Sequence, residues 1–197
     1  MKWWVDIGAL ADHPNLPKRN LNATVRSVTE LISLESTVSR IIIDNGVSGS
    51  DFTELNLTRF TQLRSLVIGD HCLSYVTMVK LIGMSELESV VIGMRGFTKY
   101  KNTNDITADP NRHFYLKNCP KLKSLKIGRY SFSDYTVIEI ENVDALEVIE
   151  IGDLNVYSPN FYYASLELKS IRIHNEWWLD MPSLKSLVFG YGAFEYC

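Results

Sequence analysis

The heptapeptide Leu122-Lys-Ser-Leu-Lys-Ile-Gly128 recurs along the chain in the general form L-x-S-L-x-I-G. Five close copies and one weaker, earlier copy share this form, and they begin at Leu63, Leu87, Leu146, Leu168, Leu184 and, for the weak copy, Val38. Successive copies begin 25, 24, 35, 24, 22 and 16 residues apart, so the basic period is about 24 residues with one insertion and one short final unit. Self-similarity at such a period is typical of a stack of like units.

Two further features recur within the units. An apolar residue, predicted to be a buried anchor, lies four residues after the glycine position, as Leu73, Phe97, Phe132, Val156 and Phe194. A second apolar alternation precedes the next heptapeptide, as Leu55 and Leu57, Val79 and Leu81, Phe114 and Leu116, and Ile138 and Ile140. Period-two spacing is typical of extended structure. Each unit is therefore predicted to contain a strand, a turn at the glycine, the anchor and a second short extended segment.

Such a unit is too small to bury its own apolar face, so neighbouring units must stack and share a core. The stretch Asn118–Phe132, with the heptapeptide followed by Phe132, resembles a unit of the leucine-rich repeat superfamily, most closely the BspA-like class. Glycine stands where many leucine-rich repeats have asparagine after the strand. The resemblance implies a β-rich repeat solenoid, a horseshoe with a parallel sheet of about seven strands and short extended or turn segments on the other side.

The repeat also divides the chain. Residues 38–197 are predicted to form the array, with an insertion near 98–112 and an incomplete last repeat. Residues 1–37 are predicted to be an N-terminal cap or a degenerate repeat. Leu21, Val25, Val28 and Ile32 have helical spacing and Ser27 with Glu30 would make a capping box, whereas Val28-Thr-Glu-Leu31 echoes Phe52-Thr-Glu-Leu55. At the open C-terminal end three alternatives stand: a longer array, end-to-end self-association, or a cap made by Trp177, Trp178 and Tyr196.

Stacking in register would place residues one unit apart beside each other, about 4.8 Å away. The second heptapeptide position then alternates in sign, as Arg64, Glu88, Lys123, Glu147 and Lys169, and the fifth position does so in Lys126, Glu150 and Arg172. Two other pairs, Lys117 with Glu141 and Arg129 with Asp153, also lie one unit apart. The basic run between Asp109 and Asp134 is therefore interpreted as lateral ion pairs and not as a nucleic-acid site.

The resemblance implies that outward residues of the sheet form a concave binding surface. Serine dominates the third heptapeptide position and glycine the seventh. The larger outward side chains, and hence the candidate contacts, are those of the fifth position together with His174: Ile42, Val67, Val91, Lys126, Glu150, Arg172 and His174. The alternative is that valine simply favours strands. Lys99, Tyr100 and Lys101 of the insertion are second-choice contact residues, because insertions in repeat proteins often flank a binding face.

Composition excludes several classes of protein. The chain has 197 residues, a formal net charge of -3 and 46% hydrophobic residues, which argues against a dedicated nucleic-acid binder. No apolar run is long enough for a membrane span, and the start Met1-Lys-Trp-Trp-Val-Asp6 lacks the apolar run of a secretory signal. We therefore expect a cytoplasmic protein, or an extracellular one if the chain is a fragment of a longer surface protein. Three widely spaced cysteines fit neither a disulfide framework nor a zinc site.

Catalytic chemistry is not predicted. His71-Cys72 is the nearest approach to a nucleophile pair, but adjacent residues in an extended turn point apart, so a packed thiol is expected. Asp105 and Asp109 hint at calcium without the spacing of a ligand ladder, and no metal or cofactor is expected. The sequence favours a noncatalytic module that binds a protein partner. The alternative is a fragment of a larger BspA-like surface or adhesion protein in which the array is mainly a spacer.

Overall fold

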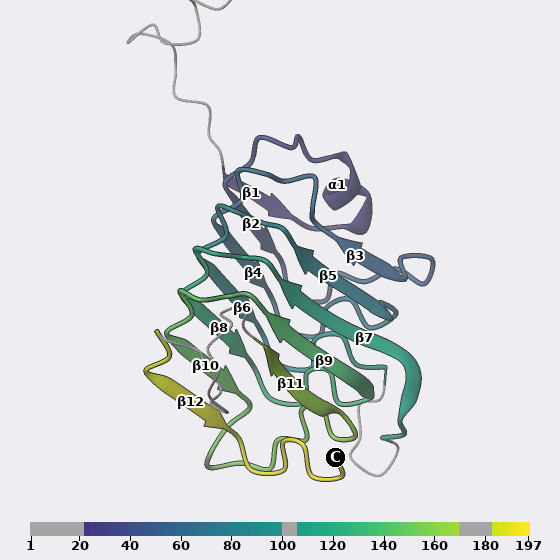
Figure 1. The fold of residues 1–197 in the computed structure, drawn as a ribbon. Helices are drawn as coiled ribbons and strands as arrows, with labels where there is room; N and C mark the ends of the chain where they lie inside the picture. The colour runs from purple at the N-terminus through teal and green to yellow at the C-terminus, as the bar shows by residue number, and fades with distance from the viewer. Residues whose placement is uncertain (1–21, 100–105, 170–182) are drawn as a thin grey trace, which may run out of the picture.

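The computed structural model describes residues 22–99, 106–169 and 183–197, and the description below concerns these residues. They form two parallel β-sheets and one short helix (Figure 1). The seven-stranded sheet contains, in spatial order, β1 (Asn22–Val25), β2 (Arg40–Ile43), β4 (Ser65–Ile68), β6 (Ser89–Ile92), β8 (Ser124–Ile127), β10 (Val148–Ile151) and β12 (Ser186–Phe189). The five-stranded sheet contains β3 (Glu54–Asn56), β5 (Met78–Ile82), β7 (Asp109–Lys117), β9 (Tyr135–Glu141) and β11 (Ser165–Lys169). A β-rich fold with a parallel sheet of seven strands is thus confirmed.

Alternation of side chains explains why the heptapeptides form strands and why the sheets face each other. The fourth heptapeptide position is fully buried in five successive strands, at Ile41, Leu66, Val90, Leu125 and Ile149. The predicted second alternation is buried as well, for example at Leu55, Val79, Phe114 and Ile138. These two sets of residues belong to one core that lies between the sheets. Because successive residues of a strand point to opposite faces, the intervening residues face outward.

A stack of phenylalanine rings lies in this core. Phe97 and Phe132 have ring centroids 4.6 Å apart, Phe132 and Phe161 4.9 Å, and Phe161 and Phe194 5.7 Å, with interplanar angles of 6° to 8°. Phe114 of β7 meets the Phe132 ring edge-on at 5.2 Å, so the stack also contacts the five-stranded sheet. The Phe132 ring is therefore both a lateral contact between units and a contact between sheets.

The prediction of Val156 as a buried anchor was wrong. The Val156 side chain is 42% exposed, and Phe161, five residues later, takes the fully buried position between Phe132 and Phe194. The turn that follows β10 is longer than its counterparts, so counting four residues from the glycine places the anchor too early. Only the aromatic ring at Phe161 continues the stack.

The heptapeptide that begins at Leu168 was also assigned to the wrong sheet. Leu168 belongs to β11, which pairs with β9 so that Leu166 lies beside Ile138 and Leu168 beside Ile140. In the seven-stranded sheet β10 pairs directly with β12, and Lys185, not Lys169, follows Glu147 in the charge column. The count of seven strands is nevertheless met, because β1 joins the sheet on the other side of β2.

Residues 22–37, the part of 1–37 that the structure describes, contain both predicted features: first a repeat-like strand and then a helix. β1 pairs with β2 in parallel, as a degenerate repeat would. Helix α1 (Val28–Ser33) follows, with Ser27 as its N-cap: the Ser27 side chain accepts a hydrogen bond from Glu30 N at 3.1 Å. Leu31 of α1 is buried against the core, and the helix covers the end of the fold beside β1 and β3 (Figure 1).

The turns after the main strands use left-handed backbone at residues other than glycine. The anchors Leu73, Phe97, Phe132, Phe161 and Phe194 have φ between 47° and 58°. Non-glycine residues seldom adopt this region, at a cost of about 1 kcal/mol each, so burial of the side chain must outweigh that cost. Glycine is required for a different reason at Gly93, where a Cβ would lie 2.8 Å from the backbone nitrogen of Asp70 in the neighbouring turn.

Ion pairs between neighbouring units support the predicted register. Arg64 lies 3.7 Å from Glu88, Lys126 2.9 Å from Glu150 and Lys185 2.9 Å from Glu147. Lys117 lies 3.3 Å from Glu141 on the other sheet. Arg129, predicted to face Asp153, instead has its guanidinium 3.3 Å from the sulfur of Met94.

The C-terminal end retains some exposed apolar surface. Leu187 of β12 holds the position that is buried in β4 to β10 yet is 43% exposed, because β12 has no second neighbour among the described strands. Tyr196 packs on Tyr162 with ring centroids 4.8 Å apart, whereas Trp177 and Trp178 lie outside the described residues. End-to-end self-association stays a prediction.

The corrected anchor can be tested by paired substitutions. Phe161→Ala should lower the free energy of unfolding by about 3–5 kcal/mol, because it removes a fully buried ring from the stack. Val156→Ala should change it by no more than about 0.5 kcal/mol, because that residue is 42% exposed and lies outside the ring stack. Urea unfolding of both variants measures the difference, and equal losses would contradict the assignment of Phe161 as the anchor.

The register can be tested at Glu147. Lys185 lowers the pKa of this exposed carboxyl through a hydrogen bond and Coulombic attraction, and Lys123 lowers it further through Coulombic attraction. Glu147→Lys would place three positive charges in one column and should lower the unfolding temperature in low salt, by less in 1 M salt. An unfolding temperature equal to or above that of the wild type in low salt would count against the register.

Candidate functional site

The outward row at the fifth heptapeptide position runs unbroken across the seven-stranded sheet. The strand pairings place Thr24 beside Ile42, then Val67, Val91, Lys126, Glu150 and Val188 in that order. Five of the seven predicted concave-face residues, from Ile42 to Glu150, are therefore brought together as lateral neighbours. Thr24 and Val188 extend the row at its two ends.

Arg172 and His174 lie outside the described residues. The place in the row that Arg172 was predicted to take, next to Glu150, is occupied by Val188. The prediction failed because the strand containing Leu168 pairs in the other sheet, so the repeat that follows β10 in space is the one at 184–190. The valine could have been identified from its own heptapeptide, which matches the consensus more closely than the one at 168–174.

The apolar half of the row adjoins a hollow. Ile42, Val67 and Val91 are half-buried or exposed, with Val91 37% exposed. Ile42 and Val67 line a shallow hollow of about 440 Å³, completed by Ile43, Asp44, Asn45 and Gly69. Beside it runs a row of small side chains in which Ser89 Oγ donates to Ser65 Oγ at 3.2 Å. Serine and glycine on the two sides of Val67 and of Val91 leave this part of the aliphatic row accessible.

The charged half of the row is neutralised within the chain. Lys126 Nζ and Glu150 Oε2 are 2.9 Å apart, with both side chains more than two-fifths exposed. An exposed pair of this kind contributes only about 0.2–1 kcal/mol to stability, but it leaves no net charge for a partner to recognise. The apolar half therefore carries whatever binding specificity this face has.

Of the three predicted loop contacts, only Lys99 lies among the described residues. It is exposed, and its backbone nitrogen donates to Asp134 Oδ2 at 3.2 Å. Tyr100 and Lys101 lie outside the described residues.

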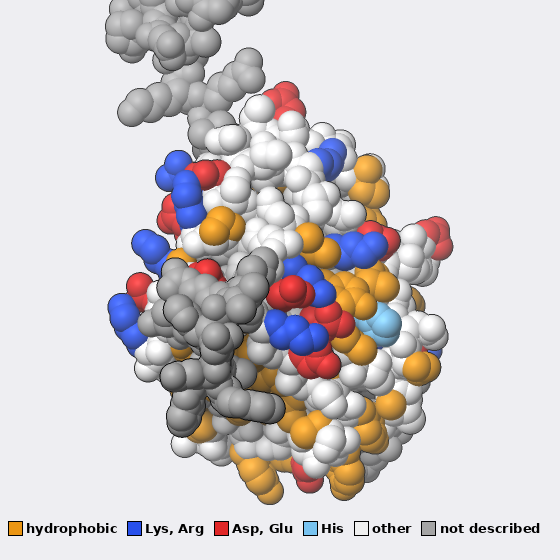
Figure 2. Space-filling view, viewed as in Figure 1, with side chains coloured by type: hydrophobic (Ala, Val, Ile, Leu, Met, Phe, Trp, Pro, Cys, Tyr) orange, Lys and Arg blue, Asp and Glu red, His pale blue; other side chains and the backbone are white. Residues whose placement is uncertain are grey.

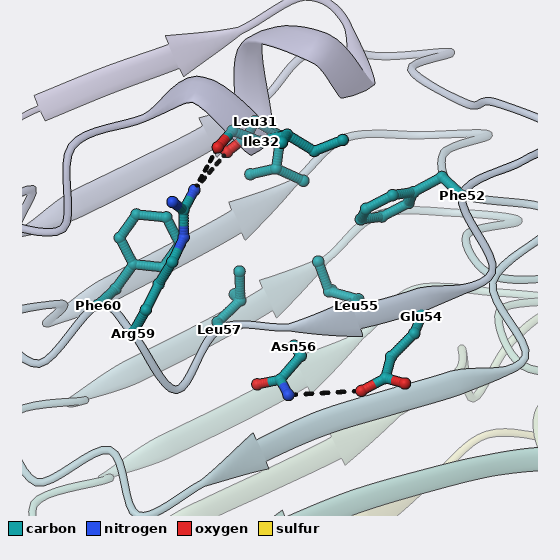
Figure 3. A pocket seen from close by; sticks show the side chains of 9 residues that line it. All are labelled: Leu31, Ile32, Phe52, Glu54, Leu55, Asn56, Leu57, Arg59 and Phe60. Carbon is teal, nitrogen blue, oxygen red and sulfur yellow. Dashed lines mark hydrogen bonds between the residues drawn. The ribbon is translucent and has the colours of Figure 1, made fainter.

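A second concavity lies between α1 and the edge strand β3, as Figure 3 shows. Its volume is about 270 Å³, and apolar side chains of Leu31, Phe52, Leu55 and Phe60 line most of it. Arg59 reaches across the groove and donates to the backbone oxygens of Leu31 and Ile32 at 3.1 and 2.8 Å, which satisfies the last carbonyls of the helix. The groove is therefore explained by the way α1 closes the end of the fold.

The outer face of the five-stranded sheet carries mixed charges. In Figure 2 basic and acidic side chains lie intermixed over the middle of this sheet. Lys117 pairs with Glu139 and with Glu141, and Lys80 lies 3.0 Å from Glu54. Hydrogen bonds to these carboxylates raise the pKa of Lys117. This face is a network of internal ion pairs and offers no patch of one sign.

A buried ion pair anchors the insertion. Arg112, 2% exposed, donates to Phe97 O at 3.0 Å and to Ser74 O at 2.8 Å, and its Nε lies 3.4 Å from Asp134 Oδ2. Burial raises the pKa of Asp134, and the nearby guanidinium opposes that rise. Tyr135 borders the cluster, and its hydroxyl donates to Val76 O at 2.6 Å. The cluster is shut off from solvent and joins the insertion to two neighbouring turns.

The thiol considered for nucleophilic chemistry is a packed one. Cys72 is fully buried, and its Sγ donates to Asp44 O at 3.0 Å. Burial raises the pKa of this thiol, which is the opposite of what an attacking thiolate needs. Across the described ranges no cluster of three or more histidine, cysteine, aspartate or glutamate residues is placed to hold a metal ion. Nor is any helix in those ranges long and apolar enough to cross a membrane.

No family model, no curated protein and no solved structure matches the chain. The likeness to leucine-rich repeats thus stays a prediction.

The role of the buried pair can be tested by removing its cation. Arg112→Met should lower the free energy of unfolding at pH 7 by about 3–5 kcal/mol, because a buried carboxylate is left unpaired. Without Arg112 the pKa of Asp134 in the folded state rises further above its unfolded value. The contribution of Asp134 to the stability of the variant is then largest at acid pH and falls as pH rises through the folded pKa, so the loss relative to wild type should be smaller at pH 5 than at pH 7.

Urea unfolding at the two pH values measures this loss. Arg64→Met is the matched control, because the Arg64 side chain is 60% exposed and its removal should cost no more than about 0.5 kcal/mol. An Arg112→Met loss that is the same at pH 5 and pH 7 would show that Asp134 is not the group left unpaired.

Proposed function

We propose that this protein is a noncatalytic, leucine-rich-repeat-like solenoid that binds a protein partner on the outer face of its seven-stranded sheet. The observation that supports it most directly is the unbroken row Ile42, Val67 and Val91, three aliphatic side chains side by side on an open face. Strand propensity explains each valine singly. It does not explain the hollow of about 440 Å³ beside Ile42 and Val67.

The chemistry of this face points to an apolar segment of the partner. The Lys126–Glu150 pair bounds the row on one side, and the serine row flanks it, so the aliphatic strip has a polar rim. Binding patches commonly combine an apolar centre with such a rim. The strip spans three strands, about 10 Å at the usual strand spacing, which suits a single apolar segment and not an extended flat interface.

A structural role as a spacer within a longer surface or adhesion protein is the second candidate. It is favoured by the internal pairing of charges on both outer faces, because surfaces satisfied in this way need no partner. The exposed Leu187 at the β12 edge is also what an interrupted array would leave. The two candidates differ in whether the aliphatic strip matters for binding.

The double variant Val67→Asp with Val91→Asp tests the proposal. Two carboxylates in the centre of the strip should reduce capture of a lysate partner at least tenfold, because each would have to be desolvated in the interface. The measurement is quantitative pull-down from the source organism's lysate, with the unfolding temperature recorded to show that the variant folds.

A matched control places the same charges elsewhere. Met78→Asp with Val137→Asp alters two half-buried, outward apolar residues in one row of the five-stranded sheet. Capture should persist in this control. Equal capture by wild type and by the Val67/Val91 variant would exclude the face as the binding site and favour the spacer.

A further inference from the structure

Another hollow lies where three turns leave the seven-stranded sheet side by side. It has a volume of about 380 Å³ and is lined by residues from the turns after β2, β4 and β6. The first turn contributes Gly46 and Ser48, the second His71, Ser74 and Tyr75, and the third Arg95, Thr98 and Lys99. Cavities that hold small ligands commonly begin near this size.

The lining of this turn hollow is basic and rich in hydroxyl groups. Arg95, Lys99 and His71 supply nitrogen donors, and none of the described residues that line the hollow is acidic. Two carboxylates that contact these turns have partners of their own: Asp70 Oδ1 accepts from Met94 N at 2.7 Å, and Asp134 Oδ2 accepts from Lys99 N and lies 3.4 Å from Arg112 Nε. The charged side chains among the described lining residues are thus those of Arg95 and Lys99, both of them cations.

The backbone holds two of these side chains in fixed positions. His71 and Arg95 occupy equivalent places in successive turns, both in the left-handed region with φ of 58° and 53°. His71 N donates to Met94 O at 2.8 Å, and Arg95 N to Arg129 O at 2.7 Å, so each turn is tied to the next. Strained residues at a lined cavity often serve a binding site.

The Arg95 guanidinium is partly positioned already. Its centre lies 5.2 Å from the Tyr130 ring, which covers one side of the group. Its buried Nε has no hydrogen-bond partner within the described part of the chain. A cation held in this way, with donors still to satisfy, is suited to an anion that accepts several hydrogen bonds at once.

We propose that this hollow binds a phosphate monoester. The dianion would lie among Arg95, Lys99 and His71 and accept hydrogen bonds from the Ser48 hydroxyl, while the Tyr75 ring at the rim, 48% exposed, packs on the group that carries the phosphate. The same chemistry is shared by a small phosphorylated metabolite and by a phosphorylated side chain of a protein. This site is independent of the proposed protein-binding strip, because its lining residues are different ones.

Isothermal titration calorimetry of the full chain tests the proposal with three probes: inorganic phosphate, ribose 5-phosphate and a phosphotyrosine pentapeptide. Saturable binding of inorganic phosphate with one site per chain is expected, and Arg95→Asn should weaken it at least tenfold. Asparagine is chosen because it tolerates the left-handed backbone better than most residues. Tighter binding of the sugar phosphate would identify a metabolite as the source of the anion, and tighter binding of the peptide a modified protein.

The matched control is Arg129→Gln, which removes the same charge from the next turn, where the guanidinium contacts Met94 and does not line the hollow. This control should bind inorganic phosphate within twofold of wild type. Lys99→Gln provides a second lining variant at an exposed position if Arg95→Asn fails to fold. Absence of saturable binding, or equal weakening by the lining variants and by Arg129→Gln, would overturn the proposal.

Discussion

The parallel register of the two sheets is the constraint on which the other features of this protein depend. Residues at equivalent positions of neighbouring strands lie directly side by side, about 4.8 Å apart. That spacing allows Phe97, Phe132, Phe161 and Phe194 to stack at 4.6 to 5.7 Å. It also brings opposite charges together across strands, and it converts isolated outward valines into a continuous strip. A slip of one residue would turn every buried side chain outward.

The turns make this register sterically possible. Each turn approaches its neighbour so closely that Gly93 and its equivalents leave no room for a side chain. In the turns after β4, β6 and β8 two left-handed residues redirect the chain toward the second sheet, and the second of them is the buried anchor. Because the anchor Phe132 packs on its neighbours in the stack and on Phe114 of the five-stranded sheet, the backbone strain of its turn and the burial of the core are coupled. Burial of the anchor side chain offsets the conformational cost of the left-handed turn.

The outer surfaces differ in how far they satisfy themselves. Ion pairs cover much of the five-stranded sheet and the charged half of the seven-stranded one, as at Lys117–Glu141 and Lys126–Glu150. On the described surface, the aliphatic strip and the turn hollow lined by Arg95 and Lys99 differ chemically from these paired regions. They lie next to each other along the same turns, since Asn45 lines one hollow and Gly46 the other.

Period and alternation in the sequence by themselves determined most strands, their inward faces and the row from Ile42 to Glu150, because these depend only on which residues repeat. They could not assign the strand at Leu168, because Leu166 and Leu168 alternate with polar residues in one phase and Ile171 and Ile173 do so in the other, so the run suits either sheet. Lateral packing of Leu166 and Leu168 on Ile138 and Ile140 decided it. Tertiary structure also chose Phe161 over Val156 as the anchor, and it gathered His71 and Arg95 into one hollow. Residues in different turns become neighbours only when the strands before them pair.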